Sequence, residues 1–183
     1  IRKADVGVAM GKNSTDVAKE AATIILTDNN FSSIVEAIKE GRHTFDNIKI
    51  FVLYLLSCNL GELMIMFLTI ATSMPIPFSS IQILWANLIA DTPPALSLGI
   101  EPIHKYTLRR LPRSPKQGLF TYKGWIVLLY QSVLMTAITL SGFALSYYVE
   151  GYSLIHSRSF TFALLISVQL VHAFHSKSIT LSL

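Results

Sequence analysis

Four long apolar runs constrain the fold of this chain more than any other feature of its 183 residues. A helix needs about 20 mainly apolar residues to cross a bilayer, and inside lipid only helices and closed barrels satisfy their backbone hydrogen bonds. The runs lie at 51–71, 81–100, 125–149 and 159–175, of which the last is short. Charged residues make up 14% of the chain, whereas soluble domains contain roughly 25%. We therefore expect a mostly α-helical transmembrane bundle of about four spans.

Residues 1–47 contain no such run and have the pattern of an α/β domain. Segments 5–10 and 22–27 have the length and composition of buried strands, and helices are expected after Ser14 or Thr15 and from Phe31 onward. Strand, helix, strand, helix is the repeating unit of a parallel sheet. We therefore expect 1–47 to be the C-terminal part of an α/β domain with a stalk, and 48–183 to be the membrane domain.

Two further expectations concern the ends of this α/β segment. Because roughly 45 residues are too few to bury a core of their own, and because the chain opens with Ile1 rather than Met, we expect further strands upstream. The polar stretch 42–49 carries Phe45 and Ile48 at helical spacing. It is expected to continue into the first span as one long helix.

Basic residues are concentrated between the second and third apolar runs. Against the single acid Glu101, this loop contains Lys105, Arg109, Arg110, Arg113, Lys116 and Lys123. The positive-inside rule places loop 101–124 in the cytoplasm, and four alternating spans then place residues 1–50 there as well. A basic loop beside a membrane also suits nucleic acid or anionic lipid. Topology is the simpler interpretation, so we expect contact with membrane lipid and no nucleic-acid partner.

Two carboxylates lie inside apolar runs, where ionisable residues are rare. Glu62 lies midway along the first run with Asn59 one helical turn before it, and Asp91 lies in the second run with Asn87 one turn before it. Such a residue costs at least ~2.5–3.5 kcal/mol at the centre of a span, and by default it marks an ion or proton path. The pairing of each acid with an amide favours a cation site over a bare proton relay.

The spacing of these four residues suits a hard cation such as Ca²⁺, which takes roughly six to eight oxygen ligands. Offsets of three and four residues place Asn59 with Glu62, and Asn87 with Asp91, on one face of each helix. Pro93 interrupts the second helix just beyond them and frees backbone carbonyls that can also bind a cation. We therefore predict an oxygen-ligand metal site formed by Asn59, Glu62, Asn87 and Asp91.

Other interpretations stay open at this point. Glu62 and Asp91 could instead form a proton path, although a proton relay does not require paired amides, and Asn59 alone suits a hydrogen bond to a neighbouring helix. Gln169, in the last run, is either a weaker ion ligand or an interhelical hydrogen-bonding residue. His172 and His175 are expected to pack or hydrogen-bond near the membrane interface rather than to bind an ion.

Several stretches of the chain resemble P-type cation-transporting ATPases. Residues 4–11, 21–31 and 40–42 are similar to the end of the phosphorylation domain of that family. Residues 54–62 and 84–95 look like its fifth and sixth membrane helices, and Arg109–Arg113 looks like the loop that follows. The resemblance runs nearly end to end and is to the calcium-pump-like branch.

The resemblance implies a fold and a chemistry that this chain holds only in part. Residues 1–47 would close a haloacid-dehalogenase-like α/β phosphorylation domain. In such pumps ATP phosphorylates an aspartate in an Asp-Lys-Thr-Gly-Thr motif, and a Gly-Asp-Gly-x-Asn-Asp motif holds Mg²⁺. Both motifs would lie upstream of Ile1, so ATP and Mg²⁺ would bind to the remainder of the same polypeptide. No catalytic residue is expected in this chain, and the transported ion would be Ca²⁺.

The resemblance also bears on the number of ions. Asn59, Glu62, Asn87 and Asp91 match four ion ligands of the two-site sarcoplasmic-type calcium pump. Where that pump has a threonine before the aspartate this chain has Ala90, and where it has a glutamate in the eighth helix this chain has Gln169. These departures favour one ion per cycle.

Four alternatives to a calcium pump remain: two concern the transported ion and two concern the class of protein. A carboxylate at position 62 is unusual for single-site calcium pumps, which leaves Na⁺ or Mn²⁺ open as the transported ion. A truncated, non-catalytic membrane partner of a pump is a further possibility. A secondary transporter is disfavoured because an α/β segment joins the first span directly.

Overall fold

The computed structural model describes residues 1–102 and 118–179, with side chains to Lys177. Within this part the chain divides into two compact units, and the boundary falls between His43 and Thr44. Five of the basic residues that predict a cytoplasmic loop, from Lys105 to Lys116, lie outside the described residues.

The first unit contains the predicted β-α-β arrangement. Strands β1 (Val8–Met10) and β2 (Ile24–Leu26) are parallel, with Val8 opposite Ile24. Helix α1 (Asp16–Glu20) connects them, and its first turn is capped by the Thr15 hydroxyl, which accepts a hydrogen bond from the Ala18 amide at 3.3 Å. Both strands are shorter than the predicted segments 5–10 and 22–27.

Helix α2 (Ser32–Ala71) runs without interruption for 40 residues, which confirms that the stretch 42–49 continues into the first span. Its start is fixed by side chains: Asn30 Oδ1 accepts from the Ser32 backbone amide at 3.1 Å, and the Ser33 hydroxyl donates to Asp28, which lowers the pKa of that carboxyl. At about 1.5 Å per residue such a helix is roughly 60 Å long. It is therefore about twice as long as the hydrocarbon core of a bilayer is thick.

The second predicted span, 81–100, is a broken helix rather than a continuous one. It consists of α3 (Ser80–Trp85), the π-helical turn η1 (Ala86–Ala90) and α4 (Thr92–Gly99), which meet at Asp91. The Asp91 amide donates to the Ala86 carbonyl at 2.9 Å, which is the wider π-type hydrogen bond. Pro93 and Pro94 have no amide proton to offer the carbonyls one turn earlier. The prolines therefore explain why the break falls at Asp91.

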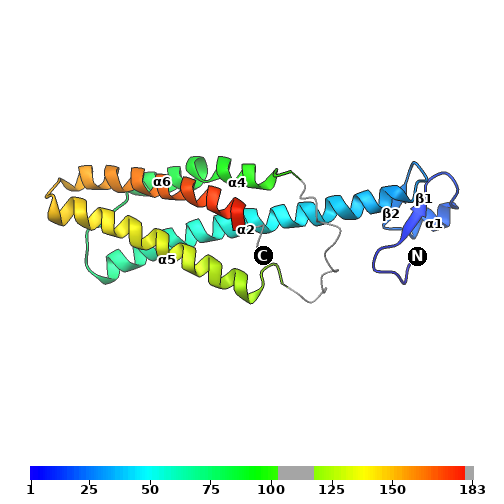
Figure 1. Ribbon diagram of the computed structural model, residues 1–183, viewed down its shortest axis with the longest axis horizontal. Coiled ribbons are helices and arrows are strands. Elements are labelled where there is room, and N and C mark those ends of the chain that lie inside the picture. Colours follow the sequence, from blue (N-terminus) through cyan, green and yellow to red (C-terminus); the bar gives the residue numbers. More distant parts are fainter. Residues whose placement is uncertain (103–117, 180–183) are drawn as a thin grey trace. The chain divides into compact units, whose positions relative to one another are not determined.

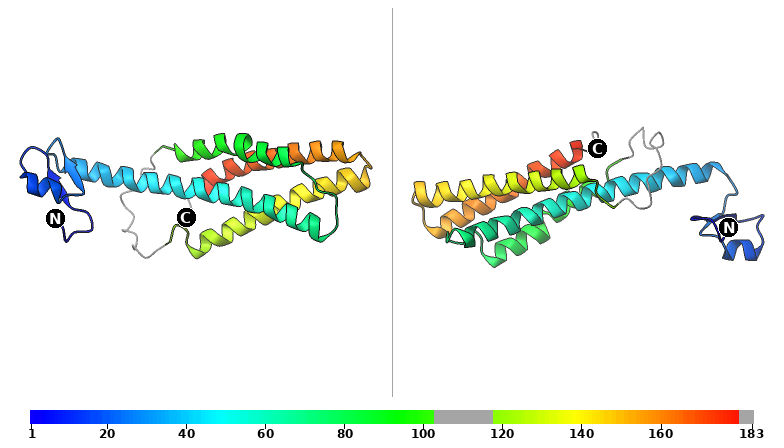
Figure 2. Two further views of the ribbon diagram at one scale, coloured as in Figure 1. Left: turned by 180° about the vertical axis from the view of Figure 1, so that it is seen from behind. Right: turned by 90° about the horizontal axis from the view of Figure 1, so that it is seen from below.

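The last two spans form an antiparallel hairpin (Figures 1 and 2). Helix α5 (Tyr122–Ala144) continues into a π-helical turn, η3 (Leu145–Val149), and α6 covers Leu154–Ile179. The predicted span 159–175 lies within α6, which begins five residues earlier and is 26 residues long. In the described part of the chain, α2, α5 with η3, and α6 are long and apolar enough to cross a membrane.

Two apolar clusters fill the interior of the second unit. One contains Ile50, Tyr54, Cys58, Ala95, Leu98, Met135 and Ala173, and the other contains Ile65, Phe78, Ala86 and Leu165. Along each of three segments a polar residue falls between the two clusters: Glu62 on α2, Asp91 at the helix break and Gln169 on α6. The fold therefore places these three residues at one level of the bundle, with apolar packing on either side.

Candidate cation site

Glu62 is buried, and its two carboxylate oxygens have different partners. Its Oε2 accepts a hydrogen bond from Asn87 Nδ2 at 2.8 Å, and its Oε1 accepts one from Gln169 Nε2 at 3.0 Å. The two donors come from η1 and α6, whereas Glu62 belongs to α2. One carboxylate therefore links three segments that are far apart in the sequence.

Asp91 is more deeply buried, with 1% of its surface exposed. Its Oδ2 accepts from Gln169 Nε2 at 3.4 Å, and its Oδ1 accepts from the Tyr54 hydroxyl, also at 3.4 Å. Gln169 thus donates to both carboxylates through one amide nitrogen, while its Oε1 is buried without a hydrogen-bond partner. This buried oxygen has no hydrogen-bond partner and lies beside two carboxylates, so it is available as a further ligand for a cation.

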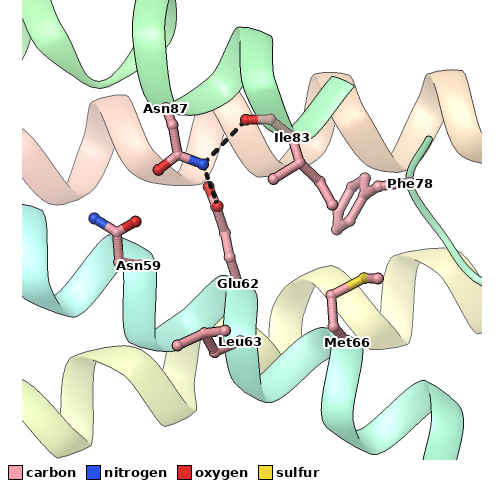
Figure 3. A pocket seen from close by; sticks show the side chains of 7 residues that line it. All are labelled: Asn59, Glu62, Leu63, Met66, Phe78, Ile83 and Asn87. Atoms are coloured by element: carbon pink, nitrogen blue, oxygen red, sulfur yellow. Dashed lines mark hydrogen bonds between the residues drawn. The ribbon is translucent and has the colours of Figure 1, made fainter. Parts of the chain in front are cut away.

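A pocket of about 260 Å³ opens beside Glu62 and is also lined by Asn59, Asn87 and apolar side chains. In Figure 3 Asn59 and Glu62 project from the same side of α2 towards Asn87, and the amide oxygens of Asn59 and Asn87 lie on one side of the Glu62 carboxylate. Asn87 uses its amide nitrogen on Glu62 and on the Ile83 carbonyl, at 2.8 and 3.0 Å. The Asn59 amide nitrogen donates to the Leu55 carbonyl of its own helix at 2.8 Å. Both amides therefore keep an oxygen for the pocket.

The structure brings four of the five predicted residues into one hydrogen-bonded network: Glu62, Asn87, Asp91 and Gln169. Asn59 lines the same pocket but is exposed and bonded within α2. Nothing in the geometry tests whether these residues bind an ion, and that role remains a prediction. Within residues 1–102 and 118–179 no three His, Cys, Asp or Glu side chains form a metal-binding group. A cation held here would rely on amide oxygens as much as on carboxylates.

Tyr54 and His172 belong to this region and were not predicted to do so. Tyr54 is fully buried and stacks on the His172 ring with 5.4 Å between ring centroids. The available signal was spacing, because Tyr54 and Glu62 are eight residues apart and so lie on one face of a helix. His172 follows Gln169 by three residues and shares a face with it for the same reason.

Glu62 and Asp91 are buried, and the contacts described for them include no cationic side chain. Charge on these carboxylates is poorly solvated in the interior of the bundle. Hydrogen bonds from three neutral donors offset part of this cost, and a bound cation or protons would offset the rest. The arrangement is chemically suited to taking up and releasing a cation between helices.

Together, the helices and the buried carboxylate–amide cluster define a multi-pass integral membrane protein with a polar centre inside its bundle. Comparison with known families makes the assignment specific. Residues 75–183 match the family model described as cation transporting ATPase, C-terminus. The chain belongs to this family, and the resemblance to calcium-pump-like P-type ATPases is confirmed.

Similar proteins carry names that agree with this assignment. The chain is 41% identical over 181 residues to a calcium-transporting ATPase of Bacillus subtilis, which covers 98% of this chain and 20% of that protein. It is 42% identical to calcium-transporting ATPase 1 of Bacillus cereus, over 100% of this chain and 22% of that protein. It is also 42% identical, over 76% of this chain and 15% of that protein, to the human calcium-transporting ATPase type 2C member 1. The chain thus spans about a fifth of the length of the two bacterial relatives.

Proposed function

We propose that this chain is part of an ATP-driven P-type pump that transports Ca²⁺, and that Asn59, Glu62, Asn87 and Asp91 bind the ion. The observation that carries the proposal is the buried pair Glu62 and Asp91, contributed by a long helix and by a helix break and joined through Gln169. A hard divalent cation matches these carboxylate and amide oxygens. The names of the relatives support Ca²⁺ as that cation.

The proposal assigns the remaining parts of the chain as follows. The β1-α1-β2 unit would be the last part of a haloacid-dehalogenase-like phosphorylation domain, and residues 1–50 with the 101–124 loop would face the cytoplasm. The 183 residues contain no Asp-Lys-Thr-Gly-Thr motif. ATP and Mg²⁺ would therefore bind elsewhere in the same polypeptide, and this chain's own residues bind and orient the transported ion.

One ion per cycle fits the charge of the site. Glu62 and Asp91 together carry two negative charges, which a single Ca²⁺ neutralises, and Gln169 adds an amide rather than a third charge. Ala90, beside Asp91, has no side-chain oxygen. We expect one Ca²⁺ transported per ATP, which the ratio of initial rates of Ca²⁺ uptake and phosphate release would measure.

The test uses the full-length protein that contains this chain, reconstituted in lipid vesicles with ATP. We expect micromolar Ca²⁺ to activate hydrolysis and uptake, and Asp91→Asn to abolish both, because it removes a charge that the ion would neutralise. Glu62→Gln keeps the size of the side chain, removes one charge and replaces one of its two acceptor oxygens with a donor. It should lower the apparent Ca²⁺ affinity by at least tenfold, since a hydrogen bond to a charged group contributes about 1.5–3 kcal/mol.

Separate titrations with Mn²⁺ and Na⁺ decide among the alternatives. Activation by Na⁺ with Ca²⁺ inert would overturn the ion assignment. Full activity in Asp91→Asn would overturn the assignment of the site. Glu36→Gln, an exposed change on the same helix as Glu62, is the matched control and should behave like the wild type.

A further inference from the structure

His172 lies one helical turn beyond Gln169 on α6 but is outside the proposed set of ion ligands. Only 6% of its surface is exposed. Its ring has two contacts, a hydrogen bond between Nε2 and Ser57 Oγ at 2.6 Å and a stack on the Tyr54 ring with an interplanar angle of 24°. Both partners belong to α2. The ring therefore joins α6 to the helix that carries Glu62.

The direction of the hydrogen bond follows from the number of protons available. The Ser57 hydroxyl has one proton and donates it to the Tyr54 carbonyl at 2.8 Å. With that bond formed, the hydroxyl oxygen accepts from His172, which assigns the proton to Nε2 of the imidazole. A donor at one edge and a stacked face together fix the ring in one orientation.

Tyr54 is also in contact with Asp91. Its hydroxyl points to Asp91 Oδ1 at 3.4 Å, which is longer than the roughly 2.5–3.0 Å of most O–H···O hydrogen bonds. At that distance a small displacement of the tyrosine ring decides whether the bond forms. Among the ring contacts of the described residues, the ring that stacks on Tyr54 is His172. His172 therefore packs against the ring whose hydroxyl faces one carboxylate of the site.

We propose that His172 is a positioning residue for the cation site: it holds the Tyr54 ring so that the Tyr54 hydroxyl orients Asp91. This inference rests on the proposed function, because it concerns the affinity of that same site. His172 touches no proposed ligand in the contacts described and acts through Tyr54. Its loss should change how tightly the ion binds while leaving the maximal rate near that of the wild type.

The experiment measures the apparent Ca²⁺ affinity and maximal rate of ATP hydrolysis for full-length variants in vesicles. His172→Phe keeps a ring that can stack and removes the donor, and we expect the apparent affinity to fall about 3- to 10-fold, the size of one or two lost hydrogen bonds. His172→Gln restores an amide donor at similar reach and should recover most of that loss. His156→Phe, the same change at an exposed position of α6, should have no effect.

A double-mutant cycle separates positioning from a general structural effect. Tyr54→Phe removes the hydroxyl that reaches Asp91, so adding His172→Phe to it should lower the affinity less than 2-fold further. Equal losses in both backgrounds, or an unchanged affinity in His172→Phe, would overturn the proposal. If His172→Phe does not fold, Ser57→Ala removes the acceptor instead and is expected to give the same loss.

The same vesicles distinguish failure of this inference from failure of the proposed function. A wild-type protein that Ca²⁺ does not activate would overturn the calcium-pump proposal and the inference with it. A wild type that is activated by Ca²⁺, an inactive Asp91→Asn and an unaltered His172→Phe would overturn the positioning role alone.

Discussion

Gln169 is the residue on which the two buried carboxylates depend most directly. It is 1% exposed and donates one amide nitrogen to both Glu62 and Asp91. A carboxylate in its place would remove both hydrogen bonds and add a third negative charge to a site with poor solvation. The neutral amide therefore lets the pair stay buried without a bound ion.

This role predicts the behaviour of Gln169→Glu. Without divalent ions, we expect the variant to lose about 3–5 kcal/mol of stability, as when a buried charge loses its partner. Calcium should restore much of that loss, because a bound cation neutralises the added charge. Thermal unfolding of the full-length protein in detergent, with chelator and with Ca²⁺, measures both effects. Equal melting temperatures for variant and wild type in chelator would contradict the argument.

The contrast between predicted and unpredicted residues has a physical cause. Glu62 and Asp91 could be selected from the sequence because a carboxylate in a membrane span is costly whatever surrounds it. Tyr54 and His172 could not, because aromatic and histidine side chains occur in spans for many reasons. Their stacking joins positions 118 residues apart and depends on how α2 and α6 pack. Spacing along one helix reveals which residues share a face, but not what that face meets.

At the scale of the elements, each apolar run coincides with helical structure, but hydropathy does not give the ends of the helices or the details of a break. The break in 81–100 was expected from Pro93, but the π-helical turn before it depends on hydrogen-bond register, which composition does not encode. Helix α6 begins before the predicted run 159–175, because its first turns contain the polar residues His156 and Arg158, which lower the local hydropathy. Arg158 donates from Nε to the Ile76 carbonyl at 2.9 Å, so a contact with the α2–α3 connection accounts for a charge in this helix.

The Asn47 side chain links α2 to the end of α4. Asn47 is buried, and its Nδ2 donates to the Gly99 carbonyl at 3.1 Å and to the Glu101 carbonyl at 3.0 Å. The last carbonyls of a helix have no partner within it, and little water reaches this side chain. Glu101 is further tied to Lys177 on α6 by an ion pair of 2.8 Å. Asn47 and Glu101 therefore connect α2, the end of α4 and α6.

Asn47→Asp tests this junction with almost no change in shape. A carboxylate facing two carbonyl oxygens replaces two hydrogen bonds by repulsion, and we expect a loss of about 2–4 kcal/mol. The midpoint of thermal unfolding of the full-length protein should fall accordingly, while Glu36→Gln on the same helix should stay within about 0.5 kcal/mol of the wild type. A stable Asn47→Asp variant would show that other contacts hold the end of α4.

At the scale of the whole molecule, the sequence predicted a division near residue 47, and the structure divides the chain at Thr44. The boundary falls inside α2, so a continuous helix belongs to both units. The α/β pattern and the apolar runs are local features, which is why each half could be predicted. The larger domain to which β1 and β2 would belong could not be derived from two strands, since their pairing alone defines no complete sheet.

Continuity of α2 across this boundary predicts that it carries motion from the α/β unit to Glu62. Inserting a flexible Gly-Ser linker at Gly41 should leave Ca²⁺-activated ATP hydrolysis measurable but sharply reduce the Ca²⁺ transported per ATP, because a flexible segment transmits no displacement along the helix axis. Gly41→Ala is the matched control: a Cβ at this position meets no atom within 4 Å, and alanine favours helix over glycine by about 1 kcal/mol. This control should transport as the wild type does.

The measurement is the ratio of Ca²⁺ uptake to phosphate release in sealed vesicles. An unchanged ratio in the linker variant would show that the pump is coupled by another route.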